Sequence, residues 1–457
     1  MQTNGQSKIS PFARSFNWLR SLITKKNLRA ELARNAVGSL TLKLVYTALS
    51  FAVGVTLARL LGAEGYGIYA YVFALVSLLS IPAEFGLPNL VVRETAKALA
   101  RQEWGAIQGV WRWAGKIVAI LTATLVLGAG VVVVIWGDRF SREQLVTFSW
   151  GLALVPLIAL GDLRGAALRG LNRVIQGQLT EQALLPGFYF LFILGTAFFL
   201  STGNLTPAMA MSLQVLAAAL AFAIGSWLLW RATPLEVRRA KPVSEGRRWL
   251  ASTLPLAFIG GMQLINHRTS ILILGLFADS AQVGIYRVAD QMSTLVSLGL
   301  FAINMVAAPQ FARLYALGDM ARLQRVATAS ARVVLSLTLP VVVIFLLFGK
   351  PLLKLIFGTE FVPAYSPLTI LSLGQLVNSA MGSVAFLLNM TGHEQDTARG
   401  MVVAAVANIV LNLVLVPLWG LKGAALASAV TLTAWNVLLW LAVRRRLKIN
   451  SMAFDLF

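Results

Sequence analysis

The stretch GGMQLINHRTSILILGLFADS, residues 260–280, places His267 and Arg268 near the middle of a largely apolar run. A helix needs about 20 such residues to cross the hydrocarbon core of a bilayer. An arginine at the centre of a membrane helix costs about 2.5–3.5 kcal/mol on insertion scales, and ionisable groups there face a bundle interior or a water-filled cavity. The stretch therefore predicts a membrane-spanning helix that carries a functional cation.

The whole chain has the composition of an integral membrane protein. Of its 457 residues, 58% are hydrophobic and 12% are charged, and the mean hydropathy is +0.75. The apolar runs are long and lack the ten-residue alternation of barrel strands, so they predict helices. Twelve spans are expected, at residues 36–61, 66–91, 112–136, 145–168, 181–201, 207–230, 250–277, 283–308, 331–349, 364–390, 400–418 and 421–443.

The positive charge is distributed unevenly between the two sides of this predicted topology. Thirty of the 39 lysines and arginines fall in the tails and even-numbered connections, and six fall in the odd-numbered connections. This is the positive-inside pattern. It accounts for the net charge of +21 without a nucleic-acid partner and predicts a multi-pass protein of the inner (cytoplasmic) membrane with both termini in the cytoplasm.

The predicted domain organisation follows from the spans. Residues 1–35 form a basic cytoplasmic tail, 36–231 a six-helix bundle, 232–249 a cytoplasmic linker, 250–444 a second bundle and 445–457 a cytoplasmic tail. In the first tail, apolar residues at helical spacing alternate with basic ones, which is typical of an interfacial helix, with a disordered basic tail as the alternative. The connections are too short for a soluble catalytic domain.

The two halves carry an internal repeat. Gly67-Ile68-Tyr69 matches Gly284-Ile285-Tyr286 at an offset of 217 residues, and each triplet follows the turn of the first hairpin of its half. Internal repeats of this kind are typical of transporters. The pattern predicts two parallel six-helix halves.

Two longer stretches resemble a known family. ARLLGAEGYGIYAYVFALVSLLSIPAEFGLPNLVVRETAK (residues 58–97) and NIVLNLVLVPLWGLKGAALASAV (residues 408–430) are similar to Wzx-type flippases of O-antigen and other lipid-linked glycans. These belong to the polysaccharide-transport branch of the multidrug/oligosaccharidyl-lipid/polysaccharide exporter superfamily. The layout matches over all twelve spans, and the motif-level likeness is confined to the two stretches.

The resemblance implies an all-α membrane protein with twelve transmembrane helices in two six-helix bundles around a central cavity. It implies a flippase that exports a polyprenyl-diphosphate-linked oligosaccharide for polysaccharide biosynthesis by alternating access, with the glycan lipid and membrane lipid as its partners. A polysaccharide polymerase and glycosyltransferases are further expected partners.

Two charges are predicted at the same depth in the first half. Lys43 lies nine residues after Arg34 and Glu84 nine before Arg93, which at 1.5 Å per residue puts both about 13 Å from the cytoplasmic edge. The same estimate puts Arg268 and Asp290 within about 4 Å of each other along the axis. Either each is an ion pair that serves only to neutralise charge, or it faces a cavity and exchanges its carboxylate for a substrate phosphate.

The site residues are predicted from depth and from polar stripes along the helices. The predicted substrate contacts are Lys43, Arg268, Arg287, Asn304, Gln375 and Asn378. The predicted counter-ions or coupling groups are Glu84, Asp290 and His267, the last being either a proton-coupling imidazole or a hydrogen-bonding wall residue. Asp162 and Glu181 are assigned to a charge network at the membrane interface.

Several function classes are disfavoured. The chain has no cysteine, which excludes disulfides and cysteine-ligated metals, and no GxxxxGK[ST] phosphate loop; no metal site and no cofactor are predicted. A drug or cation antiporter would need an acidic cavity. A peptidoglycan-precursor flippase of the same superfamily is a nearer competing function, and a membrane polysaccharide polymerase is a more remote one.

Overall fold

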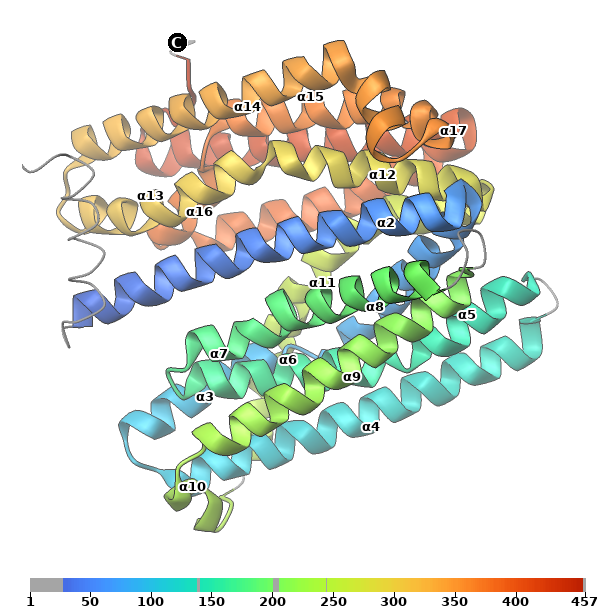
Figure 1. Cartoon of the computed structure of the whole chain (residues 1–457). Coiled ribbons are helices and arrows are strands. Elements are labelled where there is room, and N and C mark those ends of the chain that lie inside the picture. The colour runs from blue at the N-terminus through green and yellow to red at the C-terminus, as the bar shows by residue number, and fades with distance from the viewer. Residues whose placement is uncertain (1–27, 138–139, 200–204, 244, 455–457) are drawn as a thin grey trace, which may run out of the picture.

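The computed structural model describes residues 28–137, 140–199, 205–243 and 245–454 (Figure 1). Within these ranges all regular secondary structure is helical, as predicted. The predicted interfacial helix of the N-terminal tail lies outside the described residues. The elements are α2 (Leu28–Glu84), α3 (Leu87–Ala100), α4 (Trp104–Trp136), α5 (Arg142–Leu152), α6 (Leu154–Gly170), α7 (Val174–Leu179), η2 (Thr180–Leu184), α8 (Leu185–Phe199), α9 (Pro207–Ala232), α10 (Leu235–Arg239), α11 (Gly246–Phe277), α12 (Ser280–Val296), α13 (Leu298–Ala316), α14 (Met320–Ile356), η3 (Thr359–Ala364), α15 (Tyr365–Met381), α16 (Val384–Met390) and α17 (Glu394–Leu447).

The longest elements, α2 and α17, each contain one sharp turn. Gly62 in α2 has φ 68° and ψ −177°, and Gly420 in α17 has φ 52° and ψ −125°. Glycine adopts these conformations readily because it lacks a Cβ atom. Each turn divides its element into two antiparallel legs, between the two spans that the sequence predicted on either side of it.

The described residues confirm twelve spans. Eight elements or continuous pairs of elements are long and apolar enough to cross a membrane, and α12 with α13 forms a further span bent by 40°. Two of the eight are α2 and α17, each of which supplies two spans because it has two legs. The 32-residue α11 is the remaining span. The protein is therefore a multi-pass membrane protein with six spans in each half.

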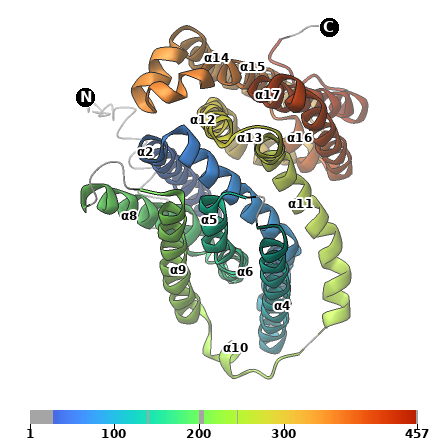
Figure 2. The same cartoon turned by 90° about the vertical axis from the view of Figure 1, so that its right-hand side faces the viewer.

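The two halves fold into two bundles, which Figure 2 shows one above the other. The N-bundle comprises α2 to α9, and the C-bundle comprises α11 to α17. Helix α11 contacts both α17 of the C-bundle and α2 and α3 of the N-bundle. The packing between the bundles is therefore carried mainly by α2 against α12 and α11.

The repeated glycines of the two halves meet where α2 crosses α12. A Cβ atom on Gly67 would lie 1.6 Å from the Ser280 carbonyl oxygen, and one on Gly284 would lie 2.2 Å from that of Ala63. Small residues allow membrane helices to approach this closely. The internal repeat thus forms the central contact between the bundles.

The molecule has two distinct ends. We call the end with the Gly62 and Gly420 turns the far end, and the end with the start of α2, with α10 and with the α13–α14 connection the basic end (Figure 1). At the far end, Glu360 Oε2 accepts a hydrogen bond of 2.8 Å from the Ala63 amide, and Arg59 Nε donates one of 2.7 Å to the Ile356 carbonyl. One hydrophobic core spans both bundles, whereas the basic end of the C-bundle has a core of its own. The bundles are therefore joined toward the far end.

The residues after α17 fold back onto the C-bundle. Ser451 Oγ donates a hydrogen bond of 3.2 Å to the Met381 carbonyl, and the Ala453 amide donates one of 2.9 Å to the Ala380 carbonyl. These carbonyls lie beside Gly382, where a φ of 74° separates α15 from α16. Residues 448–454, which we call the strap, therefore satisfy backbone groups that this break releases.

Candidate functional site

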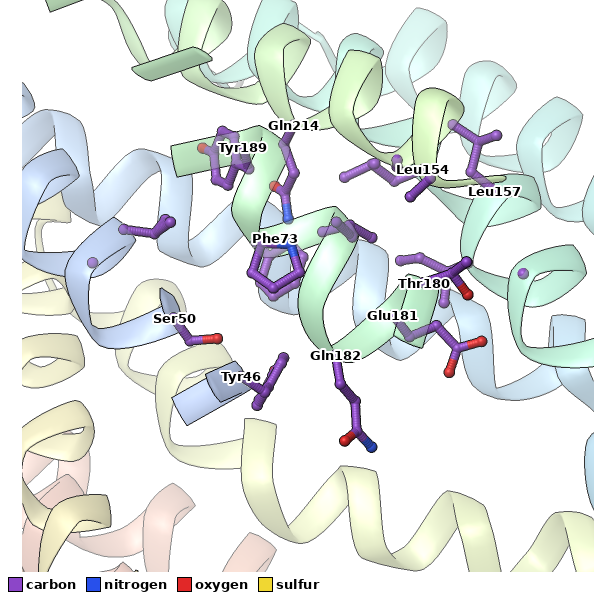
Figure 3. Close-up of a pocket in the computed structure, with 18 of the residues that line it drawn as sticks. Tyr46, Ser50, Phe73, Leu154, Leu157, Thr180, Glu181, Gln182, Tyr189 and Gln214 are labelled. Atoms are coloured by element: carbon purple, nitrogen blue, oxygen red, sulfur yellow. The ribbon is translucent and has the colours of Figure 1, made fainter. Parts of the chain in front are cut away.

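A cavity of about 400 Å³ lies on the inner face of the N-bundle. Its walls come from α2, α6, η2, α8 and α9, and three residues of the C-bundle side, Arg268, Arg287 and Gln291, complete it. Figure 3 shows Tyr46 and Ser50 of α2 bordering the same open space into which Glu181 and Gln182 of η2 project. We call this space the N-cavity.

All three cations that the sequence placed within spans line the N-cavity. The Lys43 Nζ lies 5.0 Å from the centroid of the Tyr46 ring, and the Arg268 guanidinium lies 5.2 Å from that of Phe73. Arg287 Nη1 lies 2.9 Å from Asp290 Oδ2. Cations from α2, α11 and α12 thus converge from both bundles on one space.

Two of these cations have no carboxylate partner. Among the described residues, neither Lys43 nor Arg268 forms an ion pair, and the buried Arg268 Nε has no hydrogen-bond partner. Rings of Tyr46 and Phe73 supply only weak cation–π contacts. A buried donor without a partner is costly, so this arrangement favours an anionic ligand that supplies acceptors.

The two predicted ion pairs do not form, which corrects the sequence-based pairing. Glu84 lies at the end of α2, next to the turn that leads to α3, and it is close to Asp162 and not paired with Lys43. Asp290 pairs with Arg287, which is one helical turn away, rather than with Arg268. Equal depth of two charged residues on neighbouring helices therefore does not determine whether their side chains face each other.

The N-cavity also holds charges whose position the sequence analysis missed. Arg164 is 6% exposed and donates hydrogen bonds of 2.6 Å to the Phe222 carbonyl and 2.9 Å to Thr180 Oγ1. Asp162 and Glu181 both line the cavity and lie close to each other, although the sequence assigned them to an interfacial network. Their location inside predicted spans was the signal that could have found them.

Glu181 reaches the cavity from an unusual helical segment. It lies in η2, a single π-helical stretch between α7 and α8. Such stretches are rare and are frequent at functional sites. Glu84, Asp162 and Glu181 together form a carboxyl cluster, with Arg164 as the buried cation beside it.

A second cavity, of about 720 Å³, lies within the C-bundle. We call it the C-cavity; its polar or aromatic lining residues are Asn266, His267, Ser270, Tyr286, Asp290, Ser293, Phe301, Gln375, Asn378, Phe386, Asn408, Ser428, Thr431 and Trp435. Two predicted contacts, Gln375 and Asn378, line the C-cavity, and Asn378 Nδ2 donates a hydrogen bond of 3.1 Å to Gln375 Oε1. His267 is exposed to the cavity.

The C-cavity is rich in neutral polar groups. Ser428 Oγ lies 2.7 Å from Ser270 Oγ and 3.0 Å from the Tyr286 hydroxyl. The Oγ1 of Thr431, a residue 5% exposed, and the Oδ1 of Asn266 have no hydrogen-bond partner among the described residues. Amides, hydroxyls and the Trp435 ring in one space suit a ligand with many hydroxyl groups.

One predicted contact is corrected by the bend of the eighth span. Asn304 is 7% exposed and lines neither cavity. Helices α12 and α13 meet at a bend of 40° around Ser297. Tyr286 and Asp290, which precede this bend, line the C-cavity, whereas Asn304 follows it.

Comparisons with a protein-family model and with a curated relative both point to proteins of glycan biosynthesis. A family model described as polysaccharide biosynthesis protein matches residues 32–315. Over 413 residues the chain is 24% identical to the Haloferax volcanii protein named "Probable low-salt glycan biosynthesis flippase Agl15", covering 89% of this chain and 82% of that protein.

Two solved structures share the fold. One is an inward-facing multidrug resistance MATE family transporter of the MOP superfamily, with a TM-score of 0.74 and 13% sequence identity. The aligned region covers 90% of this chain and 98% of the transporter chain. The lipid II flippase MurJ in an inward closed conformation has a TM-score of 0.70 at 13% identity, covering 89% and 87%. The predicted arrangement of two six-helix bundles is thereby confirmed.

Proposed function

Because the chain belongs to the polysaccharide biosynthesis protein family, we propose that it is a flippase that moves a polyprenyl-diphosphate-linked oligosaccharide across the membrane by alternating access. The observation that carries the proposal is the convergence of Lys43, Arg268 and Arg287 from both bundles on one cavity. The relative named as a glycan biosynthesis flippase supports the same substrate class.

The two cavities suit different parts of such a substrate. A diphosphate carries several anionic oxygens, and guanidinium and ammonium groups bind them through charge-assisted hydrogen bonds. Lys43 and Arg268 are free to do this because no carboxylate occupies them among the described residues. Sugar hydroxyls pair with the amides of Gln375 and Asn378 in the C-cavity, while the prenyl chain stays in lipid.

Asp290 is the counter-ion in this mechanism. Its Oδ2 lies 2.9 Å from Arg287 Nη1, and a phosphate that enters the N-cavity competes with it for the guanidinium. His267 and the carboxyl cluster of Glu84, Asp162 and Glu181 are the proposed coupling groups, because their side chains are ionisable and His267, Asp162 and Glu181 line the cavities.

The cellular setting follows from the charge distribution. We place the basic end in the cytoplasm and the protein in the inner membrane, since arginines and lysines are retained on the cytoplasmic side. The far end then faces the periplasm and is closed by the contacts of Glu360 and Arg59. Glycosyltransferases that build the glycan and a polymerase that extends it are the proposed functional partners.

Reconstitution in liposomes tests the proposal. A fluorescent polyprenyl-diphosphate oligosaccharide is incorporated, and its transfer between leaflets is followed by the accessibility of the sugar to a membrane-impermeant lectin. Wild-type protein is expected to accelerate transfer, and Arg268→Gln is expected to reduce the rate about 10- to 100-fold, the range for a hydrogen bond to a charged group. Arg445→Gln, at the exposed basic end, is the matched control.

The same assay separates the competing functions. Transfer of a lipid-linked peptidoglycan precursor in preference to the oligosaccharide would select that flippase class, and efflux of an organic cation without lipid transfer would select an antiporter. Equal rates for wild type and Arg268→Gln would remove the cation cluster from the mechanism.

A further inference from the structure

A third pocket lies at the basic end, apart from both cavities. It is formed where α13 ends and α14 begins, has a volume of about 630 Å³, and shares no lining residue with the N-cavity or the C-cavity. We call it the arginine pocket; its lining residues are Gln310, Arg313, Leu314, Leu317, Arg322, Arg325 and Val326. Figure 1 shows the α13–α14 connection at the same end as the start of α2.

The charge in the arginine pocket is poorly neutralised. Arg322 Nε lies 3.2 Å from Asp319 Oδ2, but Arg313 and Arg325 form no ion pair within the described part of the chain. No carboxylate is among the lining residues. One neighbouring aspartate therefore balances only one of three guanidinium groups.

Three other arginines of the basic end are paired with a nearby carboxylate. Arg446 lies 2.9 Å from Asp396, Arg93 lies 2.8 Å from Glu94, and Arg248 lies 2.9 Å from Glu245. Pairing is thus common where acidic residues are near. The arginine pocket differs because it gathers three cations around one hollow.

The backbone adds to the positive potential. Arg322 and Arg325 lie in the first two turns of α14, a 37-residue helix whose N-terminus carries a partial positive charge. Cations are disfavoured at this position and anions are favoured. The Asp319 side chain caps the helix by accepting a 3.0 Å hydrogen bond from the Arg322 amide, and other orphan amides of this turn face the same end.

The rim of the pocket is apolar. Leu317 is 67% exposed at the helix connection, and Leu314 and Val326 contribute aliphatic surface to the lining. Tyr315, 37% exposed, lies beside them and is a residue type enriched at membrane interfaces. Free phosphate and the phosphate backbone of a nucleic acid have no acyl chains that could pack against this apolar rim. A membrane lipid, in contrast, carries an anionic phosphate next to its acyl chains.

We propose that the arginine pocket binds the phosphate group of a membrane lipid in the leaflet at the basic end. Arg313 and Arg325 contact the phosphate oxygens, and Leu317 contacts the first carbons of the chains. Basic pockets between transmembrane helices on the cytoplasmic side bind lipid headgroups by this chemistry. The lipid is either an anionic phospholipid or a polyprenyl diphosphate, and both carry the phosphate that the arginines recognise.

Native mass spectrometry of the full-length protein with defined lipids tests the proposal. The protein is titrated in separate arms with phosphatidylglycerol, undecaprenyl diphosphate and phosphatidylcholine. The double variant Arg313→Gln, Arg325→Gln is compared with Arg112→Gln, Arg445→Gln, which removes two exposed charges of the basic end outside the pocket. We expect the affinity of the Arg313→Gln, Arg325→Gln variant for the anionic lipid to be at least about 10-fold lower than that of wild type, and the affinity of the control variant to be unchanged.

The arms identify the lipid. Selective loss of phosphatidylglycerol binding supports a phospholipid site, and selective loss of undecaprenyl diphosphate binding supports an initial docking site for the flippase substrate. Equal binding of the anionic lipids by wild type and the pocket variant overturns the proposal, as does wild-type binding of phosphatidylcholine as tight as that of the anionic lipids. Arg313→Lys, Arg325→Lys keeps the charge without the planar fork of donors and is expected to bind between the two, so the comparison does not depend on one variant.

Discussion

In the N-bundle the cavity is lined by Lys43, Arg268 and Arg287, whereas in the C-bundle the larger cavity is lined by amides and hydroxyls such as those of Gln375 and Asn378. The bundles are related by an internal repeat, and the repeated glycines touch each other. The shared fold therefore does not dictate shared chemistry. The difference teaches that related halves can offer a cationic cavity and a neutral polar one, which the proposed function assigns to the diphosphate and to the sugars of one substrate.

The largest expected effect comes from separating the bundles at their repeat-related crossing. Gly67→Ala would place a methyl group 1.6 Å from the Ser280 carbonyl oxygen, and overpacking of this kind costs about 1–3 kcal/mol or more. We expect lipid-linked oligosaccharide transfer in liposomes to fall at least about 10-fold, because the contact of α2 with α12 cannot close. Gly115→Ala, where nothing lies within 4 Å, is the control; equal loss in both variants would contradict this role of the crossing.

The next effect separates the cavities by the part of the substrate that each binds. Lys43→Gln is expected to weaken binding of both the glycan-bearing lipid and its sugar-free polyprenyl diphosphate about 10-fold, since it removes a charge-assisted contact. Asn378→Ala is expected to weaken only the glycan-bearing lipid, by several-fold, the loss of one neutral hydrogen bond. Binding isotherms for both lipids measure this. If both variants weakened both lipids equally, the division of labour between the cavities would be wrong.

A smaller effect concerns the strap, which packs against the C-bundle. Asn450 Oδ1 accepts a hydrogen bond of 3.1 Å from Trp440 Nε1, and the Asn450 backbone amide donates a hydrogen bond to Gln324 Oε1. Asn450→Ala removes the side-chain acceptor and is expected to destabilise the protein by about 1–2 kcal/mol, seen as a lower apparent melting temperature in detergent. Asn89→Ala, at an exposed position of α3, is the control. An unchanged melting temperature for Asn450→Ala would show that the strap is dispensable for stability.

The smallest effect concerns a paired arginine of the basic end, in contrast to the unpaired ones of the arginine pocket. Hydrogen bonds from Arg446 hold the pKa of the Asp396 carboxyl below its ordinary range. Because the folded-state pKa is depressed, the stabilisation is present above the unfolded value, about 3.9, and is lost as the pH falls through the folded-state value. Arg446→Gln should lower the melting temperature slightly at pH 7, and its difference from wild type should shrink as the pH falls below about 3.9, whereas Arg445→Gln should have no effect at any pH. A loss independent of pH would assign the effect to packing.

Much of the fold was predictable because hydrophobicity and charge act along the chain. Apolar runs long enough for a bilayer located the spans, and glycines 62 and 420 fall between the spans that they separate. The repeat around Gly67 and Gly284 predicted two related halves. These signals are local, so they do not need the tertiary structure.

The site was predicted only in part, for a physical reason that recurs. Lys43, Arg268 and Arg287 were recognised because charge in a membrane is costly and marks function. Their partners were mistaken, because a depth estimate gives a side chain's level and not its direction around the helix. Asp162 and Glu181 were assigned to the interface, although both line the N-cavity.

The sequence by itself determined that this is a twelve-span membrane protein in two related halves with cations inside it. Bilayer thickness and the cost of buried charge constrain each segment separately. Only the tertiary structure decided that Arg268 points toward the N-bundle, that Arg287 rather than Arg268 pairs with Asp290, and that the bend at Ser297 removes Asn304 from the cavity. Those outcomes depend on helix rotation, bends and the packing of residues far apart in the chain, which no local pattern specifies.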